Sequence, residues 1–171
     1  YISDKESYKK LIELYNKRDK SKPLFLFNVT IQNHGGYLTN TNWKEPVEVE
    51  GKYYTETNEY LSSTKESDNA FKYLIDYFKK QDEPTIILMY GDHQPSWDDN
   101  SKKVWDQHFI ATDKAEQTRD KYYVPYIMWA NYDIDEYDGL KWGDNQGEKN
   151  VISMNYLSSK LLEAAGVELS D

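Results

Sequence analysis

The stretch that decides the fold is Thr85-Ile86-Ile87-Leu88-Met89-Tyr90, which runs directly into Gly91-Asp92-His93-Gln94-Pro95. Residues 85–90 carry no charge and are rich in β-branched and aliphatic side chains, a composition typical of a strand buried on both faces. The residues that follow are polar and favour a turn. Side chains able to do chemistry therefore come immediately after the carboxyl end of a predicted strand.

Further helices and strands are predicted on both sides of this stretch. Residues 24–30, Leu-Phe-Leu-Phe-Asn-Val-Thr, are expected to form a buried strand, and residues 124–130 another. Residues 38–54 are expected to form a long loop, and residues 101–121 to be helical in part. Apolar spacing predicts three helices. The first begins at a Ser3-Glu6 capping box, ends by Pro23, and buries Tyr8, Leu11, Ile12 and Tyr15. The second has Phe71, Leu74, Ile75 and Phe78 on a single face, and the third runs from about Ser153 to Ala165, with Gly166 as its C-cap and Met154, Leu157 and Leu161 inward.

The order of these elements predicts the fold class. Helices alternate with continuous apolar strands, and no tight hairpin signal lies between the strands, which favours an α/β layer fold around a mostly parallel sheet. A chain of 171 residues suits one domain or a large piece of one, so residues 1–171 are expected to form a single domain fragment. In open sheets of this kind, ligands bind at the carboxyl ends of the strands.

Composition excludes several classes of partner. The net charge is −9 and the pI is about 4.9, the wrong sign for a fold-wide affinity for nucleic acid. No basic cluster suits an anionic membrane surface, and no apolar run approaches the roughly 20 residues that span a bilayer. The absence of cysteine excludes disulfides and thiolate metal sites. The 16 Tyr and five Trp residues either meet polar ligands such as sugars or fill the core.

Asp92-His93 is the strongest chemical feature of the sequence. A carboxylate oxygen beside an imidazole nitrogen suits Mn²⁺ or Zn²⁺ better than Ca²⁺. Gly91 is expected to let the backbone turn sharply, so that both side chains enter one cleft. The alternative is a polar turn that closes the strand, with Asp92 accepting backbone hydrogen bonds. The dipeptide alone leaves both interpretations open.

A second loop carries His34 within Asn33-His34-Gly35-Gly36-Tyr37, directly after the predicted strand 24–30. Its imidazole could donate a hydrogen bond to a phosphate or sulfate oxygen, and the glycines would let a ligand approach the backbone. The alternative is a turn with an exposed histidine. Because both His-bearing loops follow strands of the presumed parallel sheet, we expect His34 to share a cleft with Asp92 and His93. His108 is interpreted as structural or exposed.

Taken together, these segments resemble a known family. Residues 27–37 and 90–95 resemble the sulfatase-type catalytic domain of lipoteichoic acid synthases and related phosphoglycerol transferases. Residues 124–129 are similar to the strand that follows in those proteins, and residues 153–166 to their closing helix. Order and spacing agree, so the resemblance covers nearly the whole chain.

The resemblance implies a three-layer α/β/α fold like that of alkaline phosphatase, on the extracellular face of a bacterial membrane. In that family a Thr nucleophile attacks a phosphodiester with the help of a metal ion, usually Mn²⁺. Asp92 and His93 match the family's late metal-ligand pair, and His34 matches the histidine that contacts the phosphoglycerol group of the substrate. Arylsulfatases typically have Asp-Asn in place of the Asp-His pair, which favours phosphoryl transfer here.

The resemblance also implies that much of the site lies elsewhere. The family's nucleophile and an acidic metal ligand precede the first strand seen here, so the chain matches the C-terminal half of the domain and should be inactive alone. Its expected partners are the N-terminal half, membrane helices ahead of that half, and a phosphoglycerol-type lipid or polymer; Mn²⁺ or Zn²⁺ would bind an incomplete site. The alternatives are a sulfatase or related ester hydrolase, and a non-catalytic module in which Trp43, Trp97 and Trp142 hold glycan or teichoic acid.

Overall fold

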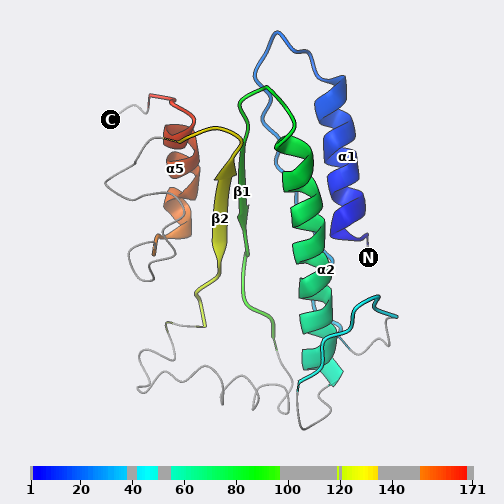
Figure 1. Cartoon of the computed structure of the whole chain (residues 1–171). Helices are drawn as coiled ribbons and strands as arrows, with labels where there is room; N and C mark the ends of the chain where they lie inside the picture. The colour runs from blue at the N-terminus through cyan, green and yellow to red at the C-terminus, as the bar shows by residue number, and fades with distance from the viewer. Residues whose placement is uncertain are drawn as a thin grey trace. The chain divides into compact units, whose positions relative to one another are not determined.

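The helices and strands of the chain fall into two units. The computed structural model describes residues 2–37, 42–49, 55–96, 119, 121–134 and 151–168. Residues 1–77 and 94–123 make up the first unit, and residues 78–93 and 124–171 the second. The elements in chain order are α1 (Asp4–Lys17), α2 (Thr55–Phe78), β1 (Ile86–Tyr90), β2 (Tyr126–Ala130), the 3-10 helix η2 (Met154–Tyr156) and α5 (Leu157–Ala164) (Figure 1).

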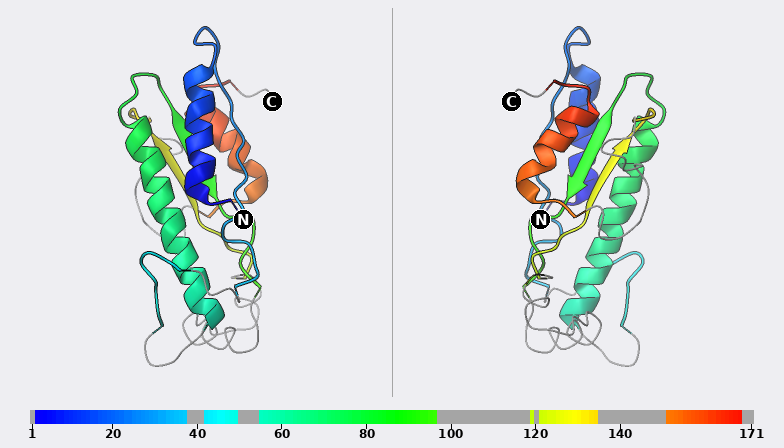
Figure 2. Two further views of the ribbon diagram at one scale, coloured as in Figure 1. Left: turned by 90° about the vertical axis from the view of Figure 1, so that its right-hand side faces the viewer. Right: turned by 90° about the vertical axis from the view of Figure 1, so that its left-hand side faces the viewer.

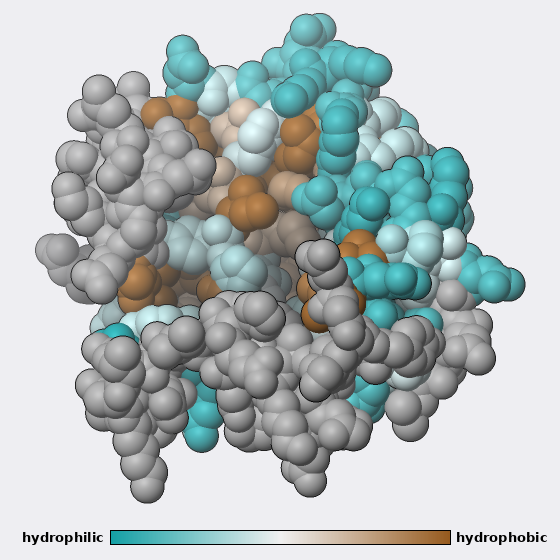
Figure 3. All heavy atoms as spheres, turned by 60° about the horizontal axis from the view of Figure 1, so that its bottom comes forward, coloured by the Kyte–Doolittle hydropathy of each residue, from teal (hydrophilic) through white to brown (hydrophobic). Residues whose placement is uncertain are grey.

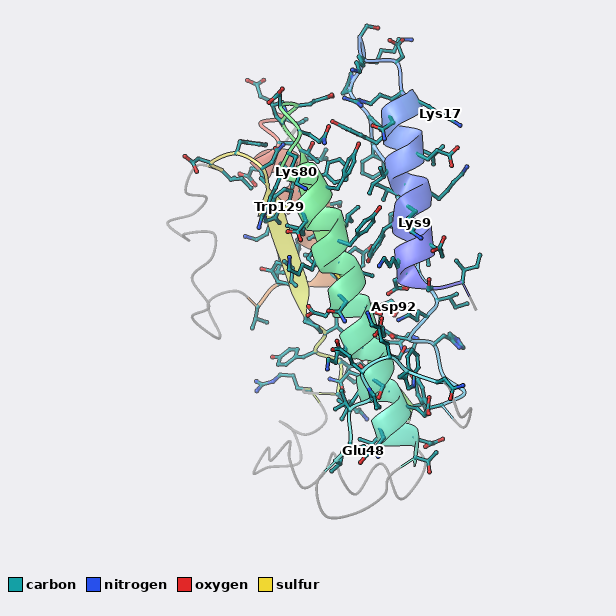
Figure 4. All side chains as sticks on the ribbon, turned by 45° about the vertical axis from the view of Figure 1, so that its right-hand side comes forward. Lys9, Lys17, Glu48, Lys80, Asp92 and Trp129 are labelled. Carbon is teal, nitrogen blue, oxygen red and sulfur yellow. The ribbon has the colours of Figure 1, made fainter. Side chains whose placement is uncertain are left out.

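Helix α1 forms where its cap and its spacing predict. Ser3 is the N-cap, and its hydroxyl accepts the backbone N–H of Glu6 at 3.3 Å, as in the first half of a capping box. The predicted inward face is buried at Tyr8, Ile12 and Tyr15, whereas Leu11 is half-buried. Lysines on the outer face, among them the labelled Lys9 and Lys17, pair with glutamates of the same helix (Figure 4).

Helix α2 packs beside α1, and the two helices run in the same direction (Figures 1 and 2). At the start of α1, Asp4 accepts a hydrogen bond from Ser67 of α2. At its end, the ring of Tyr15 meets that of Tyr77 edge-on at 6.2 Å, and the Tyr77 hydroxyl donates to Asn16 at 2.7 Å. The predicted apolar face of α2 is buried at all four positions, Phe71, Leu74, Ile75 and Phe78.

Residues 24–30 do not form the predicted buried strand. They are extended, but they belong to no strand, and alternate side chains are largely exposed: Phe25 by 74%, Phe27 by 70% and Val29 by 76%. A strand needs a neighbour to take its backbone N–H and C=O groups, and within the part of the chain that the structure describes no strand is hydrogen-bonded to this segment. Apolar side chains of this segment therefore remain exposed. On the face of the molecule that Figure 3 draws, hydrophobic patches lie between hydrophilic ones.

The described sheet is antiparallel, which corrects the prediction of a mostly parallel sheet for this pair of strands. Strands β1 and β2 pair from Ile86 with Ala130 to Tyr90 with Tyr126 (Figure 2). Gly91 N–H donates to the Pro125 carbonyl at 3.1 Å, just beyond the end of β1. The chain thus leaves β1 and returns to β2 at the same end of the ladder, so β2 must run back. Two strands do not test the three-layer arrangement, which stays a prediction.

The C-terminal helix ends as predicted. Gly166 follows the C-cap Ala165 with φ +72°, a conformation that favours glycine. Its N–H donates to the Glu163 carbonyl and that of Val167 to the Leu162 carbonyl, both at 2.9 Å, which is a Schellman motif. The predicted inward residues differ in burial: Leu157 is buried, Leu161 is half-buried, and Met154 is exposed because it lies in the short η2 turn rather than on the helix.

Some predictions fall outside the described residues. One is the partial helix over residues 101–121, apart from its last residues. The others are the predictions for His108, Trp97 and Trp142. Within the described ranges, no helix is both long and apolar enough to cross a membrane.

Asn131 joins the elements of the second unit through its side chain. Its Oδ1 accepts the Thr85 N–H at 2.8 Å, while Nδ2 lies within hydrogen-bond distance of the carbonyls of Phe78, Gln81 and Glu83 at 3.3, 2.9 and 2.9 Å. The backbone N–H of Asn131 also donates to the Thr85 carbonyl at 3.2 Å. One amide therefore links the end of α2 and the turn that follows it to the residue before β1.

We predict that Asn131→Ala lowers the free energy of unfolding by about 2–4 kcal/mol, because several part-buried backbone groups lose their partner together. Urea denaturation followed by circular dichroism measures the change. Asn155→Ala, at an exposed position of the same unit, is the matched control and should cost little. Equal, small effects of both variants would show that the Asn131 amide does not hold these elements together.

Candidate metal and substrate site

The first residue of the loop after β1 bonds to the segment that leads into β2. Beyond the last ladder pair, Gly91 donates its N–H to Pro125, and the chain then leaves the strand. Gly91 has no positive φ, so the sharp turn expected there is not what requires glycine. A Cβ at this position would lie 3.4 Å from the Cβ of Val124, an ordinary packing contact. Asp92 and His93 are thus presented by a loop that follows the strand end closely.

Asp92 and His93 place two donor atoms near each other in solvent. Asp92 Oδ1 accepts the backbone N–H of His93 at 2.9 Å, while Oδ2 lies 3.7 Å from His93 Nε2. The side chains are 84% and 69% exposed, respectively, and Asp92 is labelled in Figure 4. Both interpretations of the dipeptide are therefore compatible with the geometry: one carboxylate oxygen closes the turn, and the other faces the imidazole.

The spacing of these donors fits a shared metal ion. Two ligand atoms, each about 2.1 Å from one Mn²⁺ or Zn²⁺, can be at most about 4.2 Å apart. The separation of 3.7 Å between Asp92 Oδ2 and His93 Nε2 lies within that limit. In the ranges that the structure covers, no group of three or more His, Cys, Asp or Glu residues could hold a metal. The pair fits as part of a metal site, and further ligands would have to come from elsewhere.

The loop that carries His34 is a tight turn with an exposed imidazole. His34 donates its backbone N–H to the Ile31 carbonyl at 3.1 Å, and its Nδ1 lies 3.4 Å from the Gly35 carbonyl. Gly36 has φ +111°, which only glycine adopts readily. The turn therefore requires glycine at this position, whereas the expected approach of a ligand to the backbone of the loop stays a prediction.

Tyr37 closes this loop from its other side. Its side chain is buried, its ring meets that of Tyr60 edge-on at 5.5 Å, and its hydroxyl donates to the Asn33 carbonyl at 2.8 Å. Burial, with smaller contributions from Tyr60 and Glu56, raises the pKa of Tyr37 to about 12. The hydroxyl therefore remains a proton donor to Asn33 at neutral pH.

The residues expected to share a cleft belong to different units. His34 lies in the first unit, and Asp92 and His93 lie in the second. Their common site stays a prediction. Among the tryptophans proposed to hold glycan, Trp43 is half-buried, and its indole N–H donates to Glu59 of α2 at 2.7 Å. The one hydrogen-bond donor of this side chain is therefore used within the protein.

The structure adds buried polar residues that the sequence did not single out. Asp4, Ser63 and Ser67 are each at most 3% exposed. Ser63 and Ser67 bond to the residues just before His34, and Asp4 donates its backbone N–H to Gln32 and accepts from Ser67. A signal was present, since Ser63 and Ser67 are four residues apart on α2 and so occupy one face. Small polar residues at such spacing on a buried helix face indicate that their hydrogen bonds are made with other groups of the protein rather than with solvent.

Comparison with known proteins gives the family. The sulfatase family model matches residues 1–167, so the chain belongs to the sulfatase family, within the alkaline phosphatase superfamily. This confirms the superfamily resemblance and the α/β class; the superfamily comprises hydrolases and transferases, and sulfatase-family members generally use metal ions.

Two curated relatives come from Rhizobium meliloti (strain 1021). One, whose name assigns it to cyclic beta-1,2-glucan modification, is 29% identical over 98% of this chain and 26% of its own length. The other, the capsular polysaccharide biosynthesis protein RkpI, is 32% identical over 56% of this chain and 16% of its own length. The chain thus spans about a quarter or less of the relatives that it matches. No solved structure gives a significant match.

We predict that Gly36→Ala destabilises the first unit by about 1–3 kcal/mol, because alanine at φ +111° is strained. Thermal unfolding monitored by tyrosine and tryptophan fluorescence measures the loss. Gly35→Ala is the control, since an added Cβ there meets nothing within 4 Å and its φ is not in the left-handed region. If both substitutions are equally tolerated, the loop does not adopt this turn in solution.

Proposed function

We propose that this chain is part of a metal-dependent phosphodiester transferase that delivers a phosphoglycerol-type group to a cell-envelope polymer. The observation that carries the proposal is the exposed pairing of Asp92 Oδ2 and His93 Nε2 at 3.7 Å, next to the end of β1. Membership of the sulfatase family supports the chemistry. The names of the relatives, which refer to glucan modification and capsular polysaccharide biosynthesis, support a polysaccharide as the acceptor.

In this proposal Asp92 and His93 hold Mn²⁺ or Zn²⁺. When bound, such an ion offsets negative charge on phosphoryl oxygens and favours attack by a hydroxyl. The backbone N–H of His93 fixes Asp92 Oδ1, which leaves Oδ2 oriented toward the imidazole before any ion binds. The two ligands are thereby preorganised by a bond between neighbouring residues.

His34 is proposed to bind the phosphodiester of the substrate. Its imidazole is exposed, and both flanks of its loop are fixed by hydrogen bonds, at Ile31 before it and through Tyr37 after it. A ring nitrogen could then donate a hydrogen bond to a phosphoryl oxygen with little loss of conformational freedom. The imidazole of His93 beside a carboxylate favours a transition metal over Ca²⁺ and so favours phosphoryl over sulfuryl transfer.

The proposal assigns the nucleophile and the remaining ligands to a partner segment, the N-terminal half of the catalytic domain. Two observations support this partner. Residues 24–30 present an extended, exposed apolar segment that is hydrogen-bonded to no described strand. The curated relatives are also several times longer than the part that this chain matches. We further propose that the complete protein acts at the extracellular face of a bacterial membrane, tethered by helices of that N-terminal part, and that residues 1–171 alone are inactive.

We predict that, in the complete protein, His93→Ala abolishes activity together with bound metal, because it removes a ligand of the ion. His34→Ala should keep the metal but lower kcat/KM for a phosphodiester substrate by roughly ten- to a hundredfold, through loss of one charge-assisted hydrogen bond. Metal content by inductively coupled plasma mass spectrometry and turnover of bis(p-nitrophenyl) phosphate separate the two effects.

His108→Ala is the matched control and should change neither measurement. Equal metal content in His93→Ala and the unmodified protein would show that His93 is not a metal ligand and that Asp92-His93 is only a turn at the end of a strand. Turnover of an aryl sulfate in preference to the phosphodiester would assign the chain to sulfate-ester hydrolysis instead.

A further inference from the structure

A buried polar network lies directly behind the loop of His34. It consists of the side chains of Asp4 at the start of α1, Gln32 and Asn33 just before His34, and Ser63 and Ser67 of α2; we call these five residues the Asp4 network. All of them belong to the first unit. Asp4 is 2% exposed, and Ser63 and Ser67 are each 3% exposed, so the network is closed to solvent at its helical side.

The direction of every bond in this network follows from Asp4. A carboxylate can only accept, so the Ser67 hydroxyl donates its one proton to Asp4 Oδ2, at 2.6 Å. The two lone pairs of Ser67 Oγ then accept from Gln32 Nε2 at 3.1 Å and from Asn33 Nδ2 at 2.9 Å. Ser67 thereby uses its full hydrogen-bonding capacity, and both amides have only one possible orientation.

The remaining amide atoms are used as well. Gln32 Nε2 also donates to the Ser63 carbonyl at 3.1 Å, and Gln32 Oε1 accepts the backbone N–H of Asp4 at 3.0 Å. Asn33 Oδ1 accepts the Ser63 hydroxyl at 2.5 Å. The two residues that precede His34 are therefore fixed by five side-chain hydrogen bonds to the two helices, including the two that they donate to Ser67.

The buried side chain of Asp4 lies at the N-terminus of a helix. The carboxylate lies in the first turn of α1, where the helix dipole favours a negative charge. Its Oδ1 has no hydrogen-bond partner among the described residues, while its Oδ2 accepts from Ser67. The pKa of the neighbouring Tyr8 is raised to about 12, first by burial and then by the charge of Asp4.

We propose that Asp4 and Ser67 are positioning residues, which hold the loop of His34 so that its imidazole meets the substrate in one orientation. This inference rests on the proposed role of His34. A network that only stabilised the fold would not need to converge on the two residues beside the exposed histidine. A small error in the placement of such a group has a large kinetic effect, because a misplacement of about 1 Å can cost roughly a hundredfold in rate.

The first test is structural and does not depend on activity. In the 171-residue chain, hydrogen exchange of the His34 amide, which donates to Ile31, should become faster in Ser67→Ala. Ser62→Ala is the matched control: Ser62 is 1% exposed on the same helix and bonds to Asn58 and Val47, away from the His34 loop. Asp4→Asn is a second, isosteric variant, which removes the acceptor-only carboxylate that sets the direction of the bonds.

The second test is kinetic and uses the complete protein. Ser67→Ala should lower kcat/KM by about ten- to a hundredfold with unchanged metal content, and it should add little when His34 is already alanine. Faster His34 exchange in Ser67→Ala and Asp4→Asn but not in Ser62→Ala, with non-additive kinetics, supports the proposal. Equal exchange in Ser67→Ala and Ser62→Ala, or additive kinetic losses, overturns it. If His34→Ala alone leaves kcat/KM unchanged, it is the proposed function of His34 that fails.

Discussion

The hydrogen bond from Ser67 to the buried carboxylate of Asp4 is the constraint on which the first unit depends. It joins the start of α1 to the middle of α2, and it orders the amides of Gln32 and Asn33 that precede the His34 loop. The apolar faces of the two helices supply packing, but packing alone does not fix the direction of a loop. Polar groups with a single possible arrangement do so.

In the second unit, a neutral side chain likewise links segments that are distant in sequence through several hydrogen bonds. The Asn131 amide bonds to carbonyls in the turn after α2 and to the N–H of Thr85, just before β1. In both units a buried or half-buried polar residue therefore acts where a regular element ends and a loop begins. The candidate chemical groups, His34 in one unit and Asp92-His93 in the other, remain exposed on loops that such bonds or the sheet hold in place.

Local features were predictable from the sequence, and features that depend on partners were not. The apolar spacing around Phe71 and Leu74 gave the buried face of α2, and Gly166 marked a helix end, because both are encoded within a few residues. Residues 24–30 have the composition of a buried strand, but pairing requires a neighbour, which the described residues do not supply. The long connection from Gly91 to Pro125 concealed the antiparallel direction of β2.

The candidate site was predictable to the same extent. The resemblance of residues 90–95 pointed to Asp92 and His93, and their adjacent donors fit that prediction. Asp4 and Ser67 were missed, since a serine on a helix and an aspartate near a helix start each have an ordinary explanation when taken alone. They are 63 residues apart in sequence, and only the hydrogen bond between them shows that they belong to one network.

The central claim is that Asp92 and His93 are metal ligands of a site completed by residues outside this chain. Anomalous X-ray diffraction at the manganese edge, from crystals of the complete protein grown with Mn²⁺, tests it most directly. The account predicts a single strong peak about 2.1 Å from Asp92 Oδ2 and from a ring nitrogen of His93, with further ligands from the N-terminal part. A well-occupied peak whose ligands include neither Asp92 nor His93 would contradict it.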